Sequence, residues 1–170
     1  TQTLSGLTVS RETFVSTAEN LFRQVNIIEN PTAAPIVTTI RLEGTYSSST
    51  TTYVESSDGN ATLDVADTTH IVNVNSGMHV LHVYGSAGAA ETIDGVSGAD
   101  ASNAFYYEWQ NVSVPAGDKV IIMNFMAGAD DLAGAQALQT RFTGLQGDAL
   151  KGIETADYAK IINWSFADGD

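Results

Sequence analysis

Apolar and polar residues alternate along most of the first 127 residues, which is the pattern of short β-strands. The alternation runs through residues 4–15, 21–29 and 36–42, then through 53–55, 61–65, 70–74, 78–84 and 103–114. Successive side chains of a strand point to opposite faces, so each run predicts one strand with an apolar face. Turn residues separate the runs, among them Asn30-Pro31, Asp58-Gly59 and Asn75-Ser76-Gly77.

The most apolar stretch of the chain is residues 120–126, which read VIIMNFM. An almost continuous apolar run of this length predicts a strand that is buried on both faces. Pro115-Ala116-Gly117-Asp118 precedes it and has the residues of a tight turn, since Pro fixes φ and Gly permits positive φ. We therefore expect this strand to be central, with one layer on each side.

After residue 127 the apolar spacing changes from that of strands to that of helices. Ala135, Leu138, Phe142 and Leu145 recur at 3-4-3 intervals, which predicts an amphipathic helix of about fifteen residues. A second, shorter helix is expected from Thr155, and residues 163–166 are expected to form an extended segment that pairs with a sheet edge.

Strands followed by helices predict a mainly β protein. The expected fold is an antiparallel β-sandwich, immunoglobulin-like or jelly-roll-like, with two C-terminal helices packed on it. A parallel α/β fold is disfavoured, because the first 125 residues contain no helical pattern for a crossover. The 170 residues suit a single domain, with the sandwich over about 4–127 and the helical part over about 130–166.

Charge and composition narrow the class of partner. The chain has 20 Asp and Glu against 7 Lys and Arg, a net charge of −13, which disfavours nucleic acid and anionic membranes. No apolar run reaches the ~20 residues of a membrane span, so no membrane insertion is expected. Abundant Ser, Thr and Gly, scarce Lys and a start at Thr1 without Met predict a processed chain at the cell surface or outside the cell.

The histidines and nucleophiles offer little catalytic chemistry. His79 and His82 would point to opposite faces of one strand, so they cannot jointly hold a metal ion. No G-x-S-x-G motif is present, and the absence of Cys excludes a Cys-based zinc site. We therefore expect the protein not to be an enzyme.

Carboxylates near predicted turns suggest one cofactor, Ca²⁺. The oxygen ligands that Ca²⁺ prefers are offered by a group of six residues: Asp58, Asn60, Asp64, Asp67, Asp130 and Asp131. Their spacing fits no EF-hand. The alternative is a solvated acidic rim in which Asp130 and Asp131 cap the helix that follows.

Several segments resemble a known kind of module. They are residues 7–11 (LTVSR), residues 22–32 (FRQVNIIENPT), the turn and strand VPAGDKVIIMNF, and the C-terminal stretch LKGIETADYAKIINWSF. Together, from about residue 4 to 166, they resemble an immunoglobulin-like β-sandwich module of large secreted bacterial surface proteins. The resemblance rests on turn motifs, and it implies a structural or adhesive role outside the cell with no catalytic residues to carry over.

The function expected from these observations is a non-enzymatic extracellular structural or adhesive protein. It would assemble into a filament or tubule by strand exchange, with copies of itself or other surface proteins as partners. The N-terminal strand is the expected donor, with Leu4, Leu7 and Val9 at the interface.

The alternative function is a carbohydrate- or ligand-binding β-sandwich module. It would use the Gly-rich loop of residues 85–102 and the aromatic residues near it, which are Tyr84, Tyr106, Tyr107 and Trp109. Alternation turns only half of an aromatic strand outward, so most of these rings are expected in the core.

Overall fold

The computed structural model describes residues 2–46, 51–74, 77–97 and 104–166. Within these ranges the chain forms ten strands, one α-helix and one short 3₁₀ helix. The elements in chain order are β1 (Gln2–Leu4), β2 (Leu7–Ser16), β3 (Leu21–Glu29), β4 (Ile36–Thr45), β5 (Thr51–Ser56), β6 (Thr69–Val74), β7 (Met78–Val83), β8 (Gly95–Ser97), β9 (Ala104–Val114), β10 (Lys119–Ala129), α1 (Leu132–Thr143) and η1 (Thr155–Lys160).

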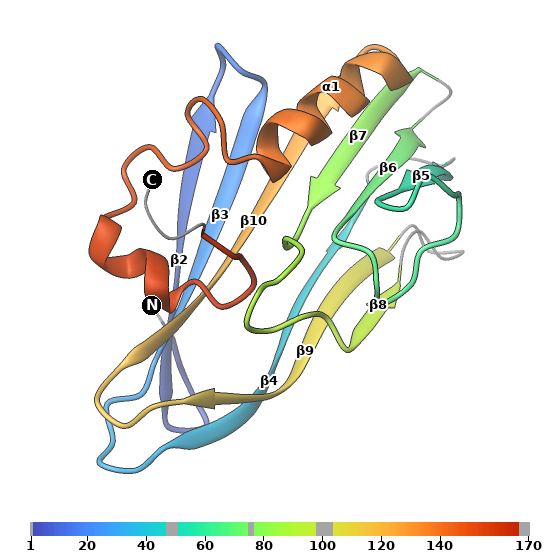
Figure 1. Cartoon of the computed structure of the whole chain (residues 1–170). Helices are drawn as coiled ribbons and strands as arrows, with labels where there is room; N and C mark the ends of the chain where they lie inside the picture. Colours follow the sequence, from blue (N-terminus) through green and yellow to red (C-terminus); the bar gives the residue numbers. More distant parts are fainter. Residues whose placement is uncertain (1, 47–50, 75–76, 98–103, 167–170) are drawn as a thin grey trace.

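The strands form two antiparallel sheets, and the protein is therefore mainly β, as the alternation predicts. The large sheet has seven strands in the order β1-β2-β3-β10-β7-β6-β5, and the small sheet has three in the order β4-β9-β8. In Figure 1, α1 crosses β10 and β7 on the side nearer the viewer, and the small sheet packs against the opposite face of β10. The arrangement is sandwich-like, with a third layer that contains the helix.

Strand β10 is the central element, and the prediction that it is buried on both faces is confirmed. Val120 and Ile122 belong to a hydrophobic cluster with Tyr107 and Trp109 of the small sheet. Met123 and Phe125, on the opposite face, pack in a second cluster that includes Ala135 and Phe142 of α1, among others. Burying a large apolar side chain stabilises the fold by about 1.5–3 kcal/mol, so the two clusters hold the three layers together.

The predicted turn before β10 is also confirmed. Asp118 N donates to Pro115 O (3.2 Å), and Gly117 has φ of +67°, a conformation that favours glycine. The Asp118 side chain contacts Lys160, and Lys119 Nζ lies 2.8 Å from Asp157 Oδ1. The turn therefore also fastens η1 to the start of β10.

Between residues 130 and 166, the structure has one α-helix rather than the two predicted. Helix α1 has 12 residues, begins after Asp131, whose Oδ1 accepts from Gly134 N (2.7 Å), and ends at Gly144. The second predicted helix is a six-residue 3₁₀ helix, η1. It stops because Ile162 N donates to Ile121 O (3.0 Å) of β10 instead of continuing a helical ladder.

A C-terminal segment completes one edge of β10. Strand β7 pairs with β10 only over Phe125–Ala129, which leaves residues 121–123 without a strand partner on that side. Ile161 bridges Ile121 in parallel, and the Asn163 side chain bonds both Met123 N (3.0 Å) and Met123 O (2.7 Å). The expected edge pairing therefore occurs, although at residues 161–163 rather than 163–166.

Two segments differ from the predicted elements. Residues 61–65, expected as a strand, are irregular, because the Asp64 and Asp67 side chains bond nearby backbone N–H groups and hold the segment in turns. The expected loop over 85–102 contains β8, which pairs with β9, and its last five residues lie outside the described ranges.

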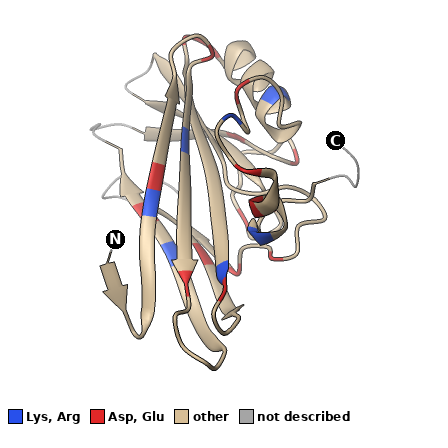
Figure 2. Ribbon diagram, turned by 90° about the vertical axis from the view of Figure 1, so that its left-hand side faces the viewer, with Lys and Arg blue, Asp and Glu red and all other residues tan. Residues whose placement is uncertain are grey.

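Charged residues lie mostly away from the sheet faces that pack together. In the view of Figure 2, acidic residues occur chiefly in turns and near η1, with a few basic residues among them. No helix in the described part of the chain is long and apolar enough to cross a membrane.

Candidate functional site

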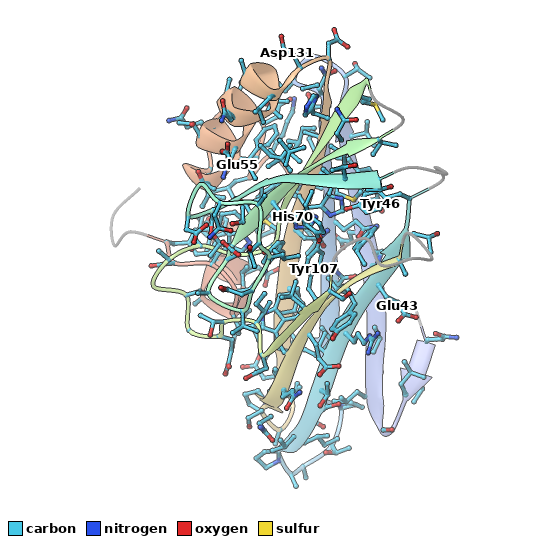
Figure 3. The ribbon with its side chains drawn as sticks, turned by 90° about the vertical axis from the view of Figure 1, so that its right-hand side faces the viewer. Glu43, Tyr46, Glu55, His70, Tyr107 and Asp131 are labelled. Carbon is cyan, nitrogen blue, oxygen red and sulfur yellow. The ribbon has the colours of Figure 1, made fainter. Side chains whose placement is uncertain are left out.

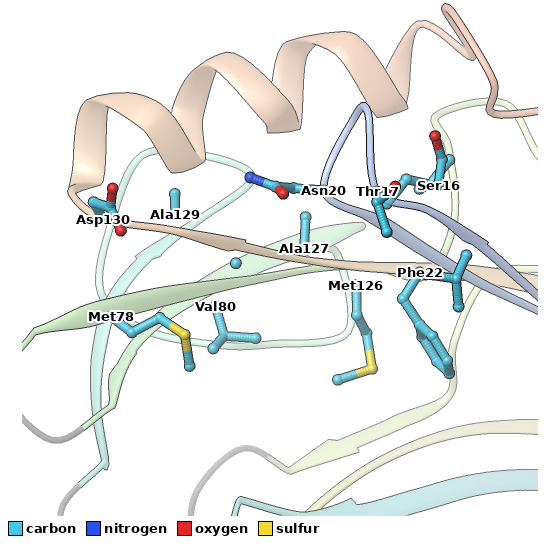
Figure 4. Close-up of a pocket in the computed structure, with 13 residues that line it drawn as sticks. Ser16, Thr17, Asn20, Phe22, Met78, Val80, Met126, Ala127, Ala129 and Asp130 are labelled. Carbon is cyan, nitrogen blue, oxygen red and sulfur yellow. The ribbon is translucent and has the colours of Figure 1, made fainter.

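A groove of about 700 Å³ opens at one end of the large sheet. It forms because the pairing of β3 with β10 ends at Phe22 and Met126, while β10 continues to Ala129. The turn between β2 and β3, which includes Asn20, therefore lies beside a stretch of β10 that has only β7 as a strand neighbour. Figure 4 shows Asn20 on the helix side of this notch and Phe22 and Met126 on the other side.

The floor of the groove is an apolar platform that the small sheet does not cover. Phe22 pairs with Met126, and Val80 lies opposite Gly128 on the same face of the sheet. The side chains of Phe22, Met126 and Val80 are half-buried, whereas Met78 is 50% exposed. In Figure 4 all four project from the same side of the sheet. An open apolar platform with an aromatic ring is a feature of ligand sites.

A row of amide side chains lies beside this platform on the same face. Gln24 pairs with Asn124, two residues along the strands from Phe22 and Met126, which is about 7 Å. Asn124 is buried, and its Oδ1 accepts from Asn26 Nδ2 (3.4 Å). Asn26 Oδ1 in turn accepts from Arg11 Nε (2.7 Å). These bonds hold Asn26 and Asn124 in position, which is the preorganisation that hydrogen-bonded recognition needs.

The charge of the groove favours a neutral ligand. Among its described lining residues the only ionisable side chain is Asp130, at one end. A phosphate or carboxylate ligand would need basic residues there, and the protein as a whole has a net charge of −13.

A buried cluster of rings lies deeper between the sheets. His70 on β6 is directly opposite His82 on β7, and the two rings stack with centroids 4.7 Å apart. The Tyr46 hydroxyl lies 3.2 Å from His70 Nε2 and 3.1 Å from His82 Nε2. Tyr107 Oη lies 2.6 Å from His82 Nδ1. Figure 3 shows Tyr46, His70 and Tyr107 together in the middle of the molecule.

Burial keeps both imidazoles in their neutral form. It lowers the pKa of His82 to about 3, and it lowers the pKa of His70 well below 6.5, with a further contribution from the charge of His82. The Tyr46 hydroxyl can donate to one ring and accept from the other, so two neutral rings satisfy the bridge. The two histidines are 0–1% exposed, so they do not contact a ligand. His82 pairs with Met126, which places the cluster beside the floor of the groove.

Sequence reasoning missed this histidine pair, although the necessary signal was present. The predicted strands 70–74 and 78–84 flank a short turn, and a hairpin closed by pairing Val74 with Met78 places His70 opposite His82. The predicted opposite orientation of His79 and His82 is confirmed, since His82 is buried between the sheets and His79 contacts Asn73 on the other face (3.4 Å).

The predicted calcium ligands lie in two loops and serve there as hydrogen-bond acceptors. Between β5 and β6, Asp58 Oδ1 accepts from Asn60 N (3.1 Å), and Asp67 Oδ1 accepts from Ser57 Oγ (2.7 Å). Asp64 Oδ1 accepts from Ala66 N (2.8 Å). In the described ranges, no three His, Asp or Glu side chains come close enough together to hold a metal ion. A calcium site at these residues stays a prediction.

The pair Asp130 and Asp131 lies between β10 and α1. Asp131 caps the helix, which was the predicted alternative to a calcium ligand, and Asp130 lines the end of the groove.

The predicted N-terminal interface residues belong to the edge of the large sheet. β1 turns back and pairs with β2, with Leu4 opposite Leu7. Leu7 is buried at 3% exposure, Val9 is half-buried, and Leu4 is 53% exposed. No contact in the single chain tests whether these residues form an interface.

Most of the predicted aromatic residues are in the core, as expected. Tyr84, Tyr107 and Trp109 are 1–2% exposed. Tyr106 faces outward instead, with the Arg41 guanidinium 3.8 Å above its ring.

Comparisons with known proteins find solved structures with a similar fold but no matching sequence family. No family model matches the chain, and no curated protein matches it. Among solved structures, one named for kojibiose phosphorylase, from the human microbiome, matches with a TM-score of 0.50 at 11% identity, over 89% of this chain and 19% of that chain. Another, named as an aldose 1-epimerase from Klebsiella pneumoniae, matches with a TM-score of 0.41 at 9% identity, over 88% of this chain and 54% of that one.

The chain thus spans about a fifth of the first of these proteins and about half of the second. The first of these matches contradicts the prediction of a structural or adhesive subunit that assembles by strand exchange. That prediction relied on likeness to bacterial surface modules, whereas the fold resembles part of a protein named for kojibiose phosphorylase. The turn motifs on which it rested fix local corners of the chain, and such corners occur in many folds.

Proposed function

We propose that this chain is a carbohydrate-binding module with an antiparallel β-sandwich fold, and that it binds a neutral sugar in the groove of the large sheet. The observation that carries the proposal is an apolar platform in the groove with amide side chains beside it on the same face. Phe22 and Met126 offer an apolar surface, and Gln24 and Asn124 lie about 7 Å away on the same face.

This combination suits the chemistry of a sugar ring. One face of a pyranose presents C–H groups that pack on an aromatic side chain, while its hydroxyls donate and accept hydrogen bonds at the rim. Side-chain amides can do both, since each has a carbonyl oxygen and an NH₂ group. A groove of about 700 Å³ is within the size range of small-molecule sites and has room for one or two sugar units.

We propose binding without catalysis. Glycoside hydrolysis usually needs two carboxylic groups on either side of the scissile bond. The described lining of the groove supplies one, Asp130, at its end. Incubating the protein with the sugars that it binds and measuring reducing ends would detect turnover, which would contradict this part of the proposal.

The predicted extracellular location and the predicted calcium ion are compatible with this proposed function. Neither is needed for the groove to bind a sugar.

The test is calorimetric titration of the protein with a panel of neutral mono- and disaccharides. We expect binding of at least one sugar, and a loss of about 10-fold or more on Phe22→Ala, because an aromatic contact and its buried area are removed. Val37→Ala is the matched control, since Val37 is 63% exposed on β4, outside the groove. If no neutral sugar binds, the function is wrong; if Phe22→Ala binds as tightly as the wild type, the site is wrong.

A further inference from the structure

The face of the large sheet that forms the apolar platform continues beyond the groove along β2 and β3. On these strands every second side chain lies on the same face, and paired residues lie side by side. The first row on this face is apolar, the second is polar, and the third ends in a guanidinium group. The register gives these three rows as Val15, Phe22 and Met126, then Thr13, Gln24 and Asn124, then Arg11, Asn26 and Ile122.

The β2 side of this face is open. Val15 is 60% exposed, and Thr13 and Arg11 are exposed as well. The third row borders a second hollow of about 340 Å³, whose lining includes Arg11, Asn26 and residues 38–42 of β4. The edge of the small sheet therefore lies beside the third row and leaves Arg11 accessible.

Arg11 has hydrogen-bond donors to spare. In the described part of the chain its one hydrogen bond runs from Nε to Asn26 Oδ1 (2.7 Å), so both of its NH₂ groups lack a partner. A guanidinium with two free NH₂ groups can form a bidentate pair with a carboxylate. The other basic residues are engaged with carboxylates, at Arg41, Lys119, Arg141, Lys151 and Lys160, or with backbone carbonyls, at Arg23.

Asn26 holds this guanidinium in place. The Asn26 side chain is buried at 4% exposure, and its Nδ2 donates to Ile122 O (3.3 Å) and Asn124 Oδ1 (3.4 Å). Arg11 is therefore anchored to an amide that is itself fixed to β10. A side chain that is already anchored loses less conformational entropy when it binds a ligand, which favours recognition through Arg11.

The charges around Arg11 favour a single carboxylate as its partner. None of the residues in the three rows is acidic, and Glu12 projects to the opposite face of β2. Arg41, the other charged residue in the described lining of the second hollow, already pairs with Glu43 (3.3 Å) and Glu108 (3.8 Å). One free guanidinium balances one carboxylate. A phosphate or a highly charged polymer would need several cations and would be repelled by the net charge of −13.

The spacing of the rows sets the size of the ligand. Phe22 and Asn26 are four residues apart on β3, which is about 13 Å. A single sugar ring that rests on Phe22 does not extend to Arg11, whereas a chain of two or three linked units does. Thr13 and Gln24 lie between the two ends, where their hydroxyl and amide groups can bond the hydroxyls of such a chain.

We propose that the ligand is an acidic oligosaccharide, in which a neutral unit rests on Phe22 and the carboxylate of a uronic acid unit bonds Arg11. The inference rests on the proposed sugar groove and names the class of sugar that the groove takes. Arg11 is not among the residues that line the groove, so its contribution can be measured separately from that of the platform.

The test is calorimetric titration with matched pairs of trisaccharides. The probes are cellotriose and maltotriose, each beside the analogue whose non-reducing terminal unit is oxidised to a uronic acid. We expect the acidic member of at least one pair to bind about 5- to 10-fold more tightly than the neutral member, as a partly solvated charged hydrogen bond allows. Raising NaCl should reduce this ratio of affinities and leave the binding of the neutral member unchanged.

Three variants locate the carboxylate. Arg11→Gln keeps a donor for Asn26 but removes the charge, and it should bring the ratio of affinities to about 1. Lys151→Gln is the matched control, since it changes the net charge equally at an exposed position and should keep the wild-type ratio. Phe22→Ala should weaken both members alike and also keep the ratio, because both rest a neutral unit on the platform.

The outcomes separate this inference from the function on which it rests. If neutral trisaccharides bind and their acidic analogues bind no more tightly, the acidic ligand is wrong and the sugar groove stands. If Arg11→Gln keeps the wild-type ratio, the carboxylate does not bond Arg11, and the inference is overturned. If no sugar of either kind binds, the proposed function fails and this inference fails with it.

Discussion

Lowering the pH from 7 to 5 should destabilise this protein through His70 and His82. Both imidazoles are neutral in the folded protein, because burial lowers the pKa of His82 to about 3 and that of His70 well below 6.5. In the unfolded chain they take up protons as the pH falls through about 6.5. Because the histidine pKa is lower in the folded protein than in the unfolded chain, stability is fully present above about pH 6.5 and is lost as the pH falls below that value.

The size of the effect follows from the shift of His82. With a pKa of 6.5 unfolded and about 3 folded, the free energy of unfolding falls by about 2 kcal/mol between pH 7 and 5. His70 is 0% exposed and stacked on His82, and its lowered pKa adds to the loss in the same direction. The contribution of His82 alone is a substantial part of the 5–15 kcal/mol by which domains are usually stable.

The measurement is urea unfolding at pH 7, 6 and 5, monitored by tryptophan fluorescence. This range lies above the ordinary pKa values of Asp and Glu, so carboxylates contribute little. His70→Phe keeps a ring in the stack and should reduce the pH-dependent loss to the part that His82 contributes, about 2 kcal/mol. His79→Gln is the matched control outside the cluster, and it should retain the wild-type dependence.

Two outcomes would refute this reasoning. One is a wild-type protein whose unfolding free energy changes by less than about 1 kcal/mol between pH 7 and 5. The other is a His70→Phe variant with the full wild-type loss, since the protons would then be taken up elsewhere.

Three further predictions concern the segments that hold the layers together. Arg23→Met should lower the free energy of unfolding by about 2–4 kcal/mol, because the buried guanidinium donates to Ala149 O (2.5 Å) and Lys151 O (2.8 Å). Urea unfolding measures this loss, and Arg41→Met, at an exposed position, should cost far less. Asn163→Ala leaves Met123 N and Tyr84 O without their partners and should lower the free energy of unfolding by about 2–4 kcal/mol, as measured by thermal unfolding. Ser165→Ala, at an exposed position, is the neutral control. Equal stability of the two variants would mean that the segment adds nothing to β10. If Asp58, Asp64 and Asp67 bind Ca²⁺, chelation with EDTA should lower the melting temperature, and an unchanged melting curve would reject the ion.

The sequence predicted the β-rich layers well because they depend on local patterns. Alternation located most of the strands, and the run over residues 120–126 identified the central one, since only a strand with a layer on each side can bury Ile121 and Ile122 at once. Asp131 and the turn at Gly117 also behave as their residue types predict.

The sites could not be predicted in the same way, because they depend on where pairing stops. The groove exists because β10 continues to Ala129, whereas its pairing with β3 ends at Met126. The two strands are nearly 100 residues apart in the sequence, so no local pattern predicts where their pairing stops. Trp109 appeared simply as a core residue from its alternation, and its unpartnered Nε1 becomes visible only in three dimensions.

The way β10 is completed has a consequence for how the chain folds. Its partners come from opposite ends of the sequence: β3 at residues 21–29 and the segment at residues 161–163. Strands β4 and β9, which are also far apart along the chain, close the small sheet. Contacts of such large sequence separation require long loops to close before they contribute, which slows folding. During synthesis, the apolar strand β10 is made before Asn163 and Trp164, so its edge lacks this partner until that segment follows. We expect a transient nascent state in which a chaperone can bind that edge.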